Sequence, residues 1–81
     1  MRVYIKLFSS LKKHLPHNSQ SNIFAIEIKR GSRIVDVVDQ IGIEREKTKI
    51  FLLNGRKASI KDQKELHDDD VVTIFPRMAG G

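Results

Sequence analysis

The stretch KIFLLNGRKAS, residues 49–59, decides the fold. Asn54 and Gly55 separate an apolar run from a polar one, and this dipeptide favours a two-residue hairpin turn because both of its positions take positive φ. The sequence therefore predicts an antiparallel β-hairpin. Its apolar arm, which contains Phe51 and Leu53, is expected to pack against a core that the rest of the chain contributes.

Two further strands are predicted before this hairpin. RVYIKLF, residues 2–8, alternates between apolar and polar positions, with Val3, Ile5 and Leu7 on one face. A period of two is typical of a half-buried strand. IFAIEIK, residues 23–29, alternates in the same way. The polar segment between them predicts one helical turn and then a loop, so the two strands form a hairpin with a long connection.

A helix and a last strand complete the predicted order. Ser32 is a suitable N-cap, the apolar residues at 34, 37, 38 and 41 form one stripe of an α-helix, and Gly42 is placed to end it. VVTIFP, residues 71–76, predicts the last strand. Pairing is expected to stop at Pro76, because proline has no N–H to donate to a ladder.

The predicted fold class is therefore α+β, in the order β-β-α-β-β-β. One main helix covers one face of a mixed sheet, and the first and last strands lie side by side, which is the β-grasp arrangement. The predicted core consists of the inward-facing apolar residues. These are Val3, Ile5, Leu7, Ile26, Ile28, Ile34, Val37, Val38, Ile41, Phe51, Leu53, Leu66, Val72 and Ile74.

Length and composition limit the function classes. A chain of 81 residues is one domain. The absence of cysteine excludes disulfides, thiolate metal sites and a cysteine nucleophile or persulfide on this chain. The N-terminus is too charged for a signal peptide, and no apolar run approaches the roughly 20 residues of a membrane span. We expect a cytoplasmic protein, and its net charge of +5 favours acidic partners.

Three motifs together resemble a known family, the ubiquitin-like sulfur carriers of the MoaD/ThiS type. They are LLNGRKAS, the pattern L-x-x-D-D-V-V-T-I-F-P, and the terminal AGG. IFPRMAGG is close to the usual family ending, F-P-P-(apolar)-A-G-G. Arg77 departs from the second proline of that pattern, and Asp69 departs from a turn glycine. Aspartate enters the left-handed region better than most residues, so the turn is expected to survive with some strain.

The resemblance implies a carrier that is not an enzyme on its own. A ubiquitin-activating-type adenylyltransferase would use ATP to adenylate the Gly81 carboxylate, and a sulfurtransferase would convert it to a thiocarboxylate. The sulfur would pass to a third protein, foremost the larger catalytic subunit of molybdopterin synthase. No bound cofactor is expected, since the ATP site belongs to the partner and the chain has no phosphate-binding motif.

The residues suit this chemistry. Residues 1–76 are expected to form the β-grasp domain and residues 77–81 a flexible tail. Two glycines without Cβ atoms allow close approach to a partner, and a proline at the exit lowers the ordering cost of docking. The residues predicted to thread into the partner are Pro76, Arg77, Met78, Ala79 and Gly80, ahead of the reactive Gly81.

The sheet face opposite the helix is predicted to dock the activating enzyme. By alternation it carries Phe8, Leu52, Thr73 and Phe75. Scattered surface apolar residues are the alternative interpretation. A contiguous apolar patch is the functional one.

Other site interpretations are weaker. His14, His17 and His67 are interpreted as surface residues, and Asp68 to Asp70 as a turn, so no metal site is predicted. The basic residues lack the interleaved aromatics that nucleic-acid binding requires.

Alternative functions stay open. The carried sulfur could serve thiamine or cysteine synthesis, or Gly81 could be joined to lysines of target proteins as ubiquitin is. A plain β-grasp interaction domain without tail chemistry is the third class.

Overall fold

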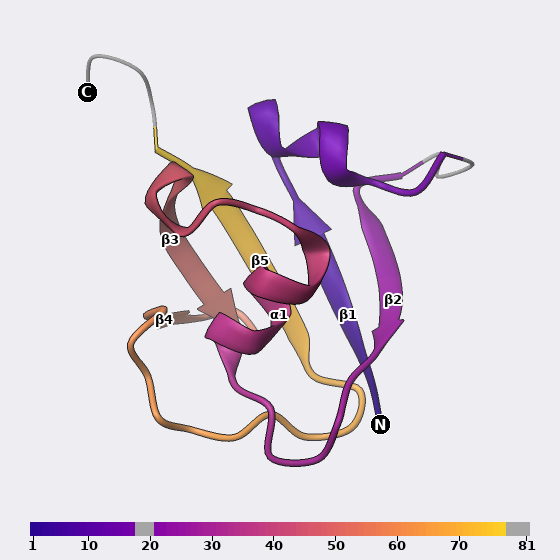
Figure 1. Ribbon diagram of the computed structural model, residues 1–81, viewed down its shortest axis with the longest axis vertical. Helices are drawn as coiled ribbons and strands as arrows, with labels where there is room; N and C mark the ends of the chain where they lie inside the picture. The colour runs from indigo at the N-terminus through magenta and orange to yellow at the C-terminus, as the bar shows by residue number, and fades with distance from the viewer. Residues whose placement is uncertain (18–20, 78–81) are drawn as a thin grey trace.

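The computed structural model describes residues 1–17 and 21–77. A five-stranded mixed sheet crosses the molecule, with one α-helix packed on one of its faces (Figure 1). The elements, in chain order, are β1 (Arg2–Leu7), the 3₁₀ helix η1 (Ser9–His14), β2 (Ile23–Glu27), α1 (Ile34–Ile41), the 3₁₀ helix η2 (Arg45–Lys47), β3 (Thr48–Leu53), β4 (Arg56–Ala58) and β5 (Val71–Pro76).

The strand order is β2-β1-β5-β3-β4. The pair β1–β5 is parallel, and the three other neighbouring pairs are antiparallel. The prediction that the first and last strands lie side by side is therefore confirmed, and so is the β-grasp arrangement. Figure 1 shows the two ends of the sheet: β1 and β5 both begin near the N-terminus, and β5 ends at the opposite pole beside η1.

The core lies between α1 and the inward face of the sheet. Alternate residues of the two central strands are fully buried, including Val3, Ile5 and Leu7 on β1 and Val72 and Ile74 on β5. Their side chains pack against one stripe of α1, formed by Ile34, Val37 and Val38. The period-two and helical patterns thus place the same residues inside that the sequence predicted.

Three predicted core residues are only half-buried: Ile26, Ile41 and Leu53. Ile26 lies on an edge strand, Ile41 in the last turn of α1 and Leu53 at the end of β3, so each packs against the core from its periphery. Two buried residues of the hydrophobic core were missed. Leu11 enters from η1, and Ile43 enters just beyond α1.

The end of α1 explains the burial of Ile43. Gly42 takes φ 91°, as predicted for a glycine that ends a helix. The Ile43 N–H then donates to the Val38 carbonyl at 3.1 Å, which is the six-to-one bond of a Schellman motif. This closure turns the chain back over the helix and carries the Ile43 side chain into the core.

The predicted N-cap was wrong by one residue. Arg33, not Ser32, is the N-cap of α1, and its N–H donates to the Asp36 carboxylate at 2.8 Å. Ser32 is engaged elsewhere: its carbonyl accepts the Leu66 N–H at 2.8 Å. A carboxylate in the first turn therefore serves the helix start, while the serine backbone anchors the segment before β5.

The turns behave as the sequence predicted. Asn54 and Gly55 take φ 52° and 82°, so the β3–β4 turn has positive φ at both central positions. Asp69 takes φ 69°, so the turn before β5 forms with aspartate in the left-handed region, as expected.

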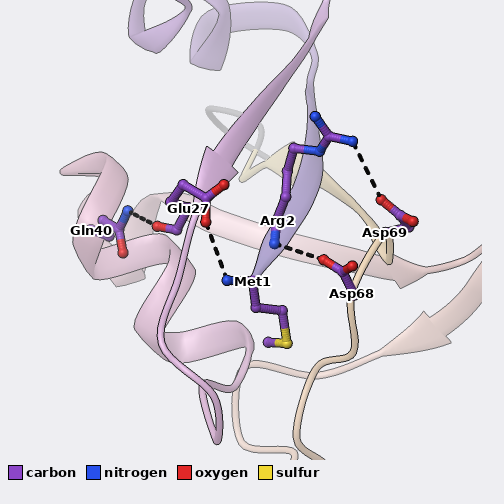
Figure 2. A network of polar contacts seen from close by, with 6 residues as sticks. All are labelled: Met1, Arg2, Glu27, Gln40, Asp68 and Asp69. Carbon is purple, nitrogen blue, oxygen red and sulfur yellow. Dashed lines mark hydrogen bonds and ion pairs between the residues drawn. The ribbon is translucent and has the colours of Figure 1, made fainter.

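A polar network ties the N-terminal pole together (Figure 2). The Arg2 N–H donates to the Asp68 carboxylate at 2.8 Å, and the Met1 amino group lies 3.2 Å from a Glu27 carboxylate oxygen. Gln40 of α1 donates to the Glu27 carbonyl at 2.9 Å. The network joins β1, β2, α1 and the turn before β5.

Candidate functional site

The candidate site is the pole where β5 ends. Of the residues predicted to thread into a partner, Pro76 and Arg77 are described, and Met78, Ala79, Gly80 and the reactive Gly81 lie outside the described residues. The structure describes the chain up to Arg77 and the sheet face beside the end of β5.

Strand pairing ends at Pro76, as predicted. Pro76 is buried at the end of β5, opposite Thr48 of β3. Beyond it, the Arg77 N–H donates to the Lys47 carbonyl at 2.8 Å. This bond goes to η2 and lies outside the β3–β5 ladder, so the prediction that pairing stops at Pro76 is confirmed. Proline removes only its own donor, and Arg77 still has an N–H that faces η2.

The β3 partner strand is irregular at this point. Thr48 pairs with Pro76 and Ile50 pairs with Phe75, so Lys49 is an extra residue in β3. Such a bulge leaves one residue unpaired and bends its strand. It lies next to the Thr48–Pro76 pair, where the proline has no N–H to donate to the ladder, and a bulge is a usual place for proline in a sheet.

The open face of the sheet carries the predicted docking residues together. Phe8 and Phe75 are half-buried, and their rings stack with centroids 4.9 Å apart and planes 10° from parallel. Leu52 pairs with Thr73 in register, so these two side chains share that face. The structure therefore brings all four predicted residues onto one face around the last half of β5, but Thr73 is buried there, with only 8% exposed.

The one large apolar residue that is exposed among the described residues was missed. Ile50 pairs with Phe75 and is 43% exposed. The alternation that placed Leu52 outward also places Ile50 outward, so the signal was present in the sequence. We define the open-face patch as Phe8, Ile50, Leu52, Thr73 and Phe75.

Cations border the open-face patch. Lys6 lies beside Thr73 on β1, and Lys57 lies beside Leu52 on β4, both directly opposite in register. Within residues 1–17 and 21–77, neither lysine forms an ion pair. The patch thus combines an apolar centre with unpaired positive charge, which suits an acidic partner surface.

An ion pair supports η2, which holds the carbonyl that Arg77 binds. Arg45 donates to both oxygens of Asp39, at 3.0 and 2.6 Å, and so joins η2 to α1. The hydrogen bond from Arg45 and its charge hold the pKa of Asp39 below its usual value, against a smaller opposing effect of desolvation. The same bond raises the pKa of Arg45.

The remaining candidates stay apart from this pole or from one another. Within the described part of the chain, no group of three histidine, cysteine or acidic residues is close enough to hold a metal ion. The Nδ1 atom of His67 lies 4.0 Å from an oxygen of Asp70, at the pole where β5 begins. No helix among the described residues is long and apolar enough to cross a membrane.

The fold and this pole define a class: a ubiquitin-like β-grasp protein with apolar side chains on the open face of its sheet, around the end of the last strand. The chain belongs to the ThiS family, because the profile of that family matches residues 6–81. A search of curated proteins finds no match.

Two solved structures share the fold. A Pyrococcus furiosus protein, provisionally named molybdopterin converting factor, subunit 1, is 24% identical with a TM-score of 0.68, over 95% of this chain and 98% of that one. SAMP1 from Haloferax volcanii is 18% identical with a TM-score of 0.70 over the whole of both chains.

Proposed function

We propose that this protein is a sulfur carrier whose Gly81 carboxylate is converted to a thiocarboxylate that donates its sulfur. The ThiS family match carries the proposal, because it extends over residues 6–81 and so includes both terminal glycines. Proteins of the ThiS and MoaD type are small carriers and not catalysts themselves. The chemistry therefore needs partners that supply the active sites.

The proposed reaction has two steps. A carboxylate oxygen of Gly81 attacks the α-phosphorus of ATP in the activating enzyme, and pyrophosphate leaves. A sulfur nucleophile, equivalent to hydrosulfide, then attacks the acyl carbon, and AMP leaves with that oxygen while a proton is released. Adenylation is needed because a carboxylate is a poor electrophile until its oxygen becomes part of a good leaving group.

The partners are an activating enzyme of the ubiquitin-activating type, a sulfurtransferase and a sulfur-accepting enzyme. The open-face patch is the proposed docking surface for the first. Its exposed Ile50 and stacked Phe8 and Phe75 provide apolar contact, and Lys6 and Lys57 provide charge. ATP binds to the partner, and this chain binds no cofactor.

Molybdopterin synthesis is the proposed destination of the sulfur. The name of the Pyrococcus furiosus neighbour supports this choice, since its structure matches this one with a TM-score of 0.68. In that pathway the chain would be the small subunit of molybdopterin synthase, bound to the larger catalytic subunit in the cytoplasm.

Alkylation followed by intact mass spectrometry tests the proposal. Because the sequence has no cysteine, a thiol-directed maleimide has one expected target, the thiocarboxylate at Gly81. We expect one adduct after incubation with ATP, an activating enzyme and a sulfur donor, and none when ATP is omitted. Replacing a carboxylate oxygen with sulfur adds about 16 Da, and so does the oxidation of a methionine. The adduct distinguishes the two, because only the thiocarboxylate reacts with the maleimide. No adduct under any of these conditions would refute the carrier function.

A further inference from the structure

A groove lies beside β4, the strand at one edge of the sheet. Among the described residues, no strand pairs with β4 on its outer side, and the chain leaves this edge after β4 before it returns to the sheet at β5 (Figure 1). The groove has a volume of about 410 Å³. Its lining includes Leu53, Arg56, Lys57, Ala58, Asp62 and Lys64, and we call it the β4 groove.

One part of the β4 groove is apolar. Leu53 and Ala58 are half-buried and pack against the hydrophobic core. Ala58 pairs with the buried Phe51, and Arg56 pairs with Leu53, so the side chains of Ala58 and Arg56 point to the core face of the sheet. The apolar part of the groove therefore lies on the face opposite the open-face patch.

Cations border this apolar surface. Arg56, Lys57 and Lys64 line the groove, together with one carboxylate, that of Asp62. All three basic residues are exposed, and none of them forms an ion pair within residues 1–17 and 21–77. The Asp62 carboxylate already accepts the Ser59 N–H at 2.9 Å. The groove thus has an excess of unpaired positive charge, which favours an acidic occupant.

The free edge of β4 offers one residue for strand pairing. The two-residue turn makes Leu53 and Arg56 the hydrogen-bonded pair that closes the hairpin. Because such pairs alternate with non-hydrogen-bonded pairs, Lys57 directs its N–H and C=O away from β3. The next residue that faces outward, Ser59, is already engaged, since its N–H and its carbonyl both bond to Asp62. Within β4, Lys57 alone therefore has backbone groups free to pair.

We propose that the β4 groove binds a short, extended, acidic segment of a partner protein, which adds to the sheet as an antiparallel strand beside β4. In such a strand one residue exchanges two backbone hydrogen bonds with Lys57. Directly opposite side chains are in contact, so the segment has acidic residues opposite Arg56 and Lys57 and an apolar residue opposite Ala58. Backbone bonds then give affinity, and the side-chain contacts give specificity.

Two other occupants fit the groove less well. A second copy of this chain, paired antiparallel at the same edge, would place Lys57 opposite Lys57, and like charges in that position are destabilising. A phosphate ligand would use the cations but neither the apolar surface nor the backbone groups of Lys57, and the carboxylate of Asp62 would repel it. An acidic segment uses the charge, the apolar surface and the strand edge together.

Titration with a synthetic peptide, followed in amide NMR spectra of the full chain, tests the proposal. The probe is the capped peptide Thr-Ile-Glu-Glu-Thr, and Thr-Ile-Lys-Lys-Thr is its control. We expect the acidic peptide to give saturable shifts in the β3–β4 hairpin and to protect the Lys57 amide from hydrogen exchange, because that N–H gains an acceptor. The basic peptide should do neither. No saturable change at Lys57 with millimolar acidic peptide would overturn the proposal, and the cations would then only keep the edge from pairing.

Charge-reversal variants test the position of the site. Arg56→Glu and Lys64→Glu should each weaken binding of the acidic peptide about three- to tenfold at low salt, because an attractive pair becomes a repulsive one. Lys29→Glu is the matched control, since Lys29 is exposed and follows β2 at the other edge of the sheet. It should change the affinity by less than about twofold. Equal losses in all three variants would show that net charge alone attracts the peptide, and would overturn the site.

Inorganic pyrophosphate separates strand addition from simple anion binding. We expect it to bind at least about tenfold more weakly than the acidic peptide, and to leave the Lys57 amide unprotected. Pyrophosphate that binds as tightly as the peptide would make the groove an anion site and overturn strand addition. None of these measurements involves Gly81 or an activating enzyme, so their outcome is independent of the carrier function.

Discussion

The two poles of the sheet are held by different kinds of contact. Where β5 begins, polar side chains join the turns: Asn54 donates to the Asp70 carboxylate at 2.9 Å and accepts the Val71 N–H at 2.9 Å. Where β5 ends, a ring stack, a bulge and one backbone bond hold the strand. The first pole uses side chains for stability, and the second leaves its apolar side chains available to a partner.

Removal of the terminal glycines should give the largest functional effect with no structural one. A chain that ends at Ala79 has no acceptor at the right position, so we expect its sulfur loading to fall to background. Its unfolding temperature should equal that of the native chain, because residues 1–77 already contain the sheet, helix and core. Maleimide adducts and thermal unfolding are measured on the same preparation. Loading that survives the deletion would contradict the role of Gly81.

A substitution at the opposite pole, where β5 begins, should show the reverse pattern: it should lower the stability of the fold and leave sulfur loading unchanged. The Asp70 side chain is only 13% exposed and accepts the His67 N–H at 2.7 Å in addition to its bond from Asn54. Asp70→Ala leaves these donors without their partner, so we expect a loss of about 1–3 kcal/mol in the free energy of unfolding. Urea unfolding checks this. Loading by the fraction that remains folded should be unchanged.

A double-mutant cycle with Asn54→Ala sharpens that prediction. Residues in one hydrogen-bond network are not additive, so the double variant should lose less than the sum of the two single losses. Strict additivity would mean that the Asn54–Asp70 bond contributes nothing to stability.

Sequence patterns predicted what local chemistry determines. Alternation placed Val3, Ile5 and Leu7 inward, and Asn54 with Gly55 gave the turn, because strand faces and positive φ depend on neighbouring residues. The same alternation gathered the open-face patch.

What the sequence did not predict depends on contacts between distant segments. Leu11 is buried because η1 lies against the sheet, and Ile43 because a Schellman closure returns it to the core. Arg77 bonds to Lys47 because η2 happens to end there. No pattern within a strand or a tail contains that information.

Each pole contains a residue with positive φ, and substitutions at these two residues should have smaller effects on the free energy of unfolding, in opposite directions. Gly55 takes φ 82° with open space where a Cβ would be, so Gly55→Ala introduces strain without a clash. We expect it to cost about 1–2 kcal/mol. Ser9 takes φ 55°, so Ser9→Gly relieves strain and should be neutral or stabilising. Urea unfolding should give a lower midpoint for Gly55→Ala and an equal or higher midpoint for Ser9→Gly. A destabilised Ser9→Gly would mean that the serine side chain has a role of its own.

The smallest expected effect is the pH dependence of the Asp39–Arg45 pair. The hydrogen bond and charge of Arg45 lower the pKa of the Asp39 carboxyl in the folded protein below its ordinary value of 3.8. The unfolded chain therefore binds the proton more readily, and the pair contributes stability above pH 3.8 that disappears as pH falls through the lower folded pKa. Both side chains are about half exposed, so solvent and salt reduce the contribution.

Asp39→Asn tests this dependence, with Arg45→Lys as its matched variant. Asp39→Asn should be slightly less stable than the native chain at neutral pH, and the difference should vanish at acid pH or in about 1 M salt. Arg45→Lys keeps the charge and loses the bidentate hydrogen bond that the guanidinium makes to Asp39. Its stability at neutral pH should therefore lie between that of Asp39→Asn and that of the native chain. Because η2 carries the Lys47 carbonyl that binds Arg77, a kcat for adenylation that falls together with this small stability loss would connect the pair to the end of β5. An unchanged kcat would confine the pair to the junction of α1 and η2.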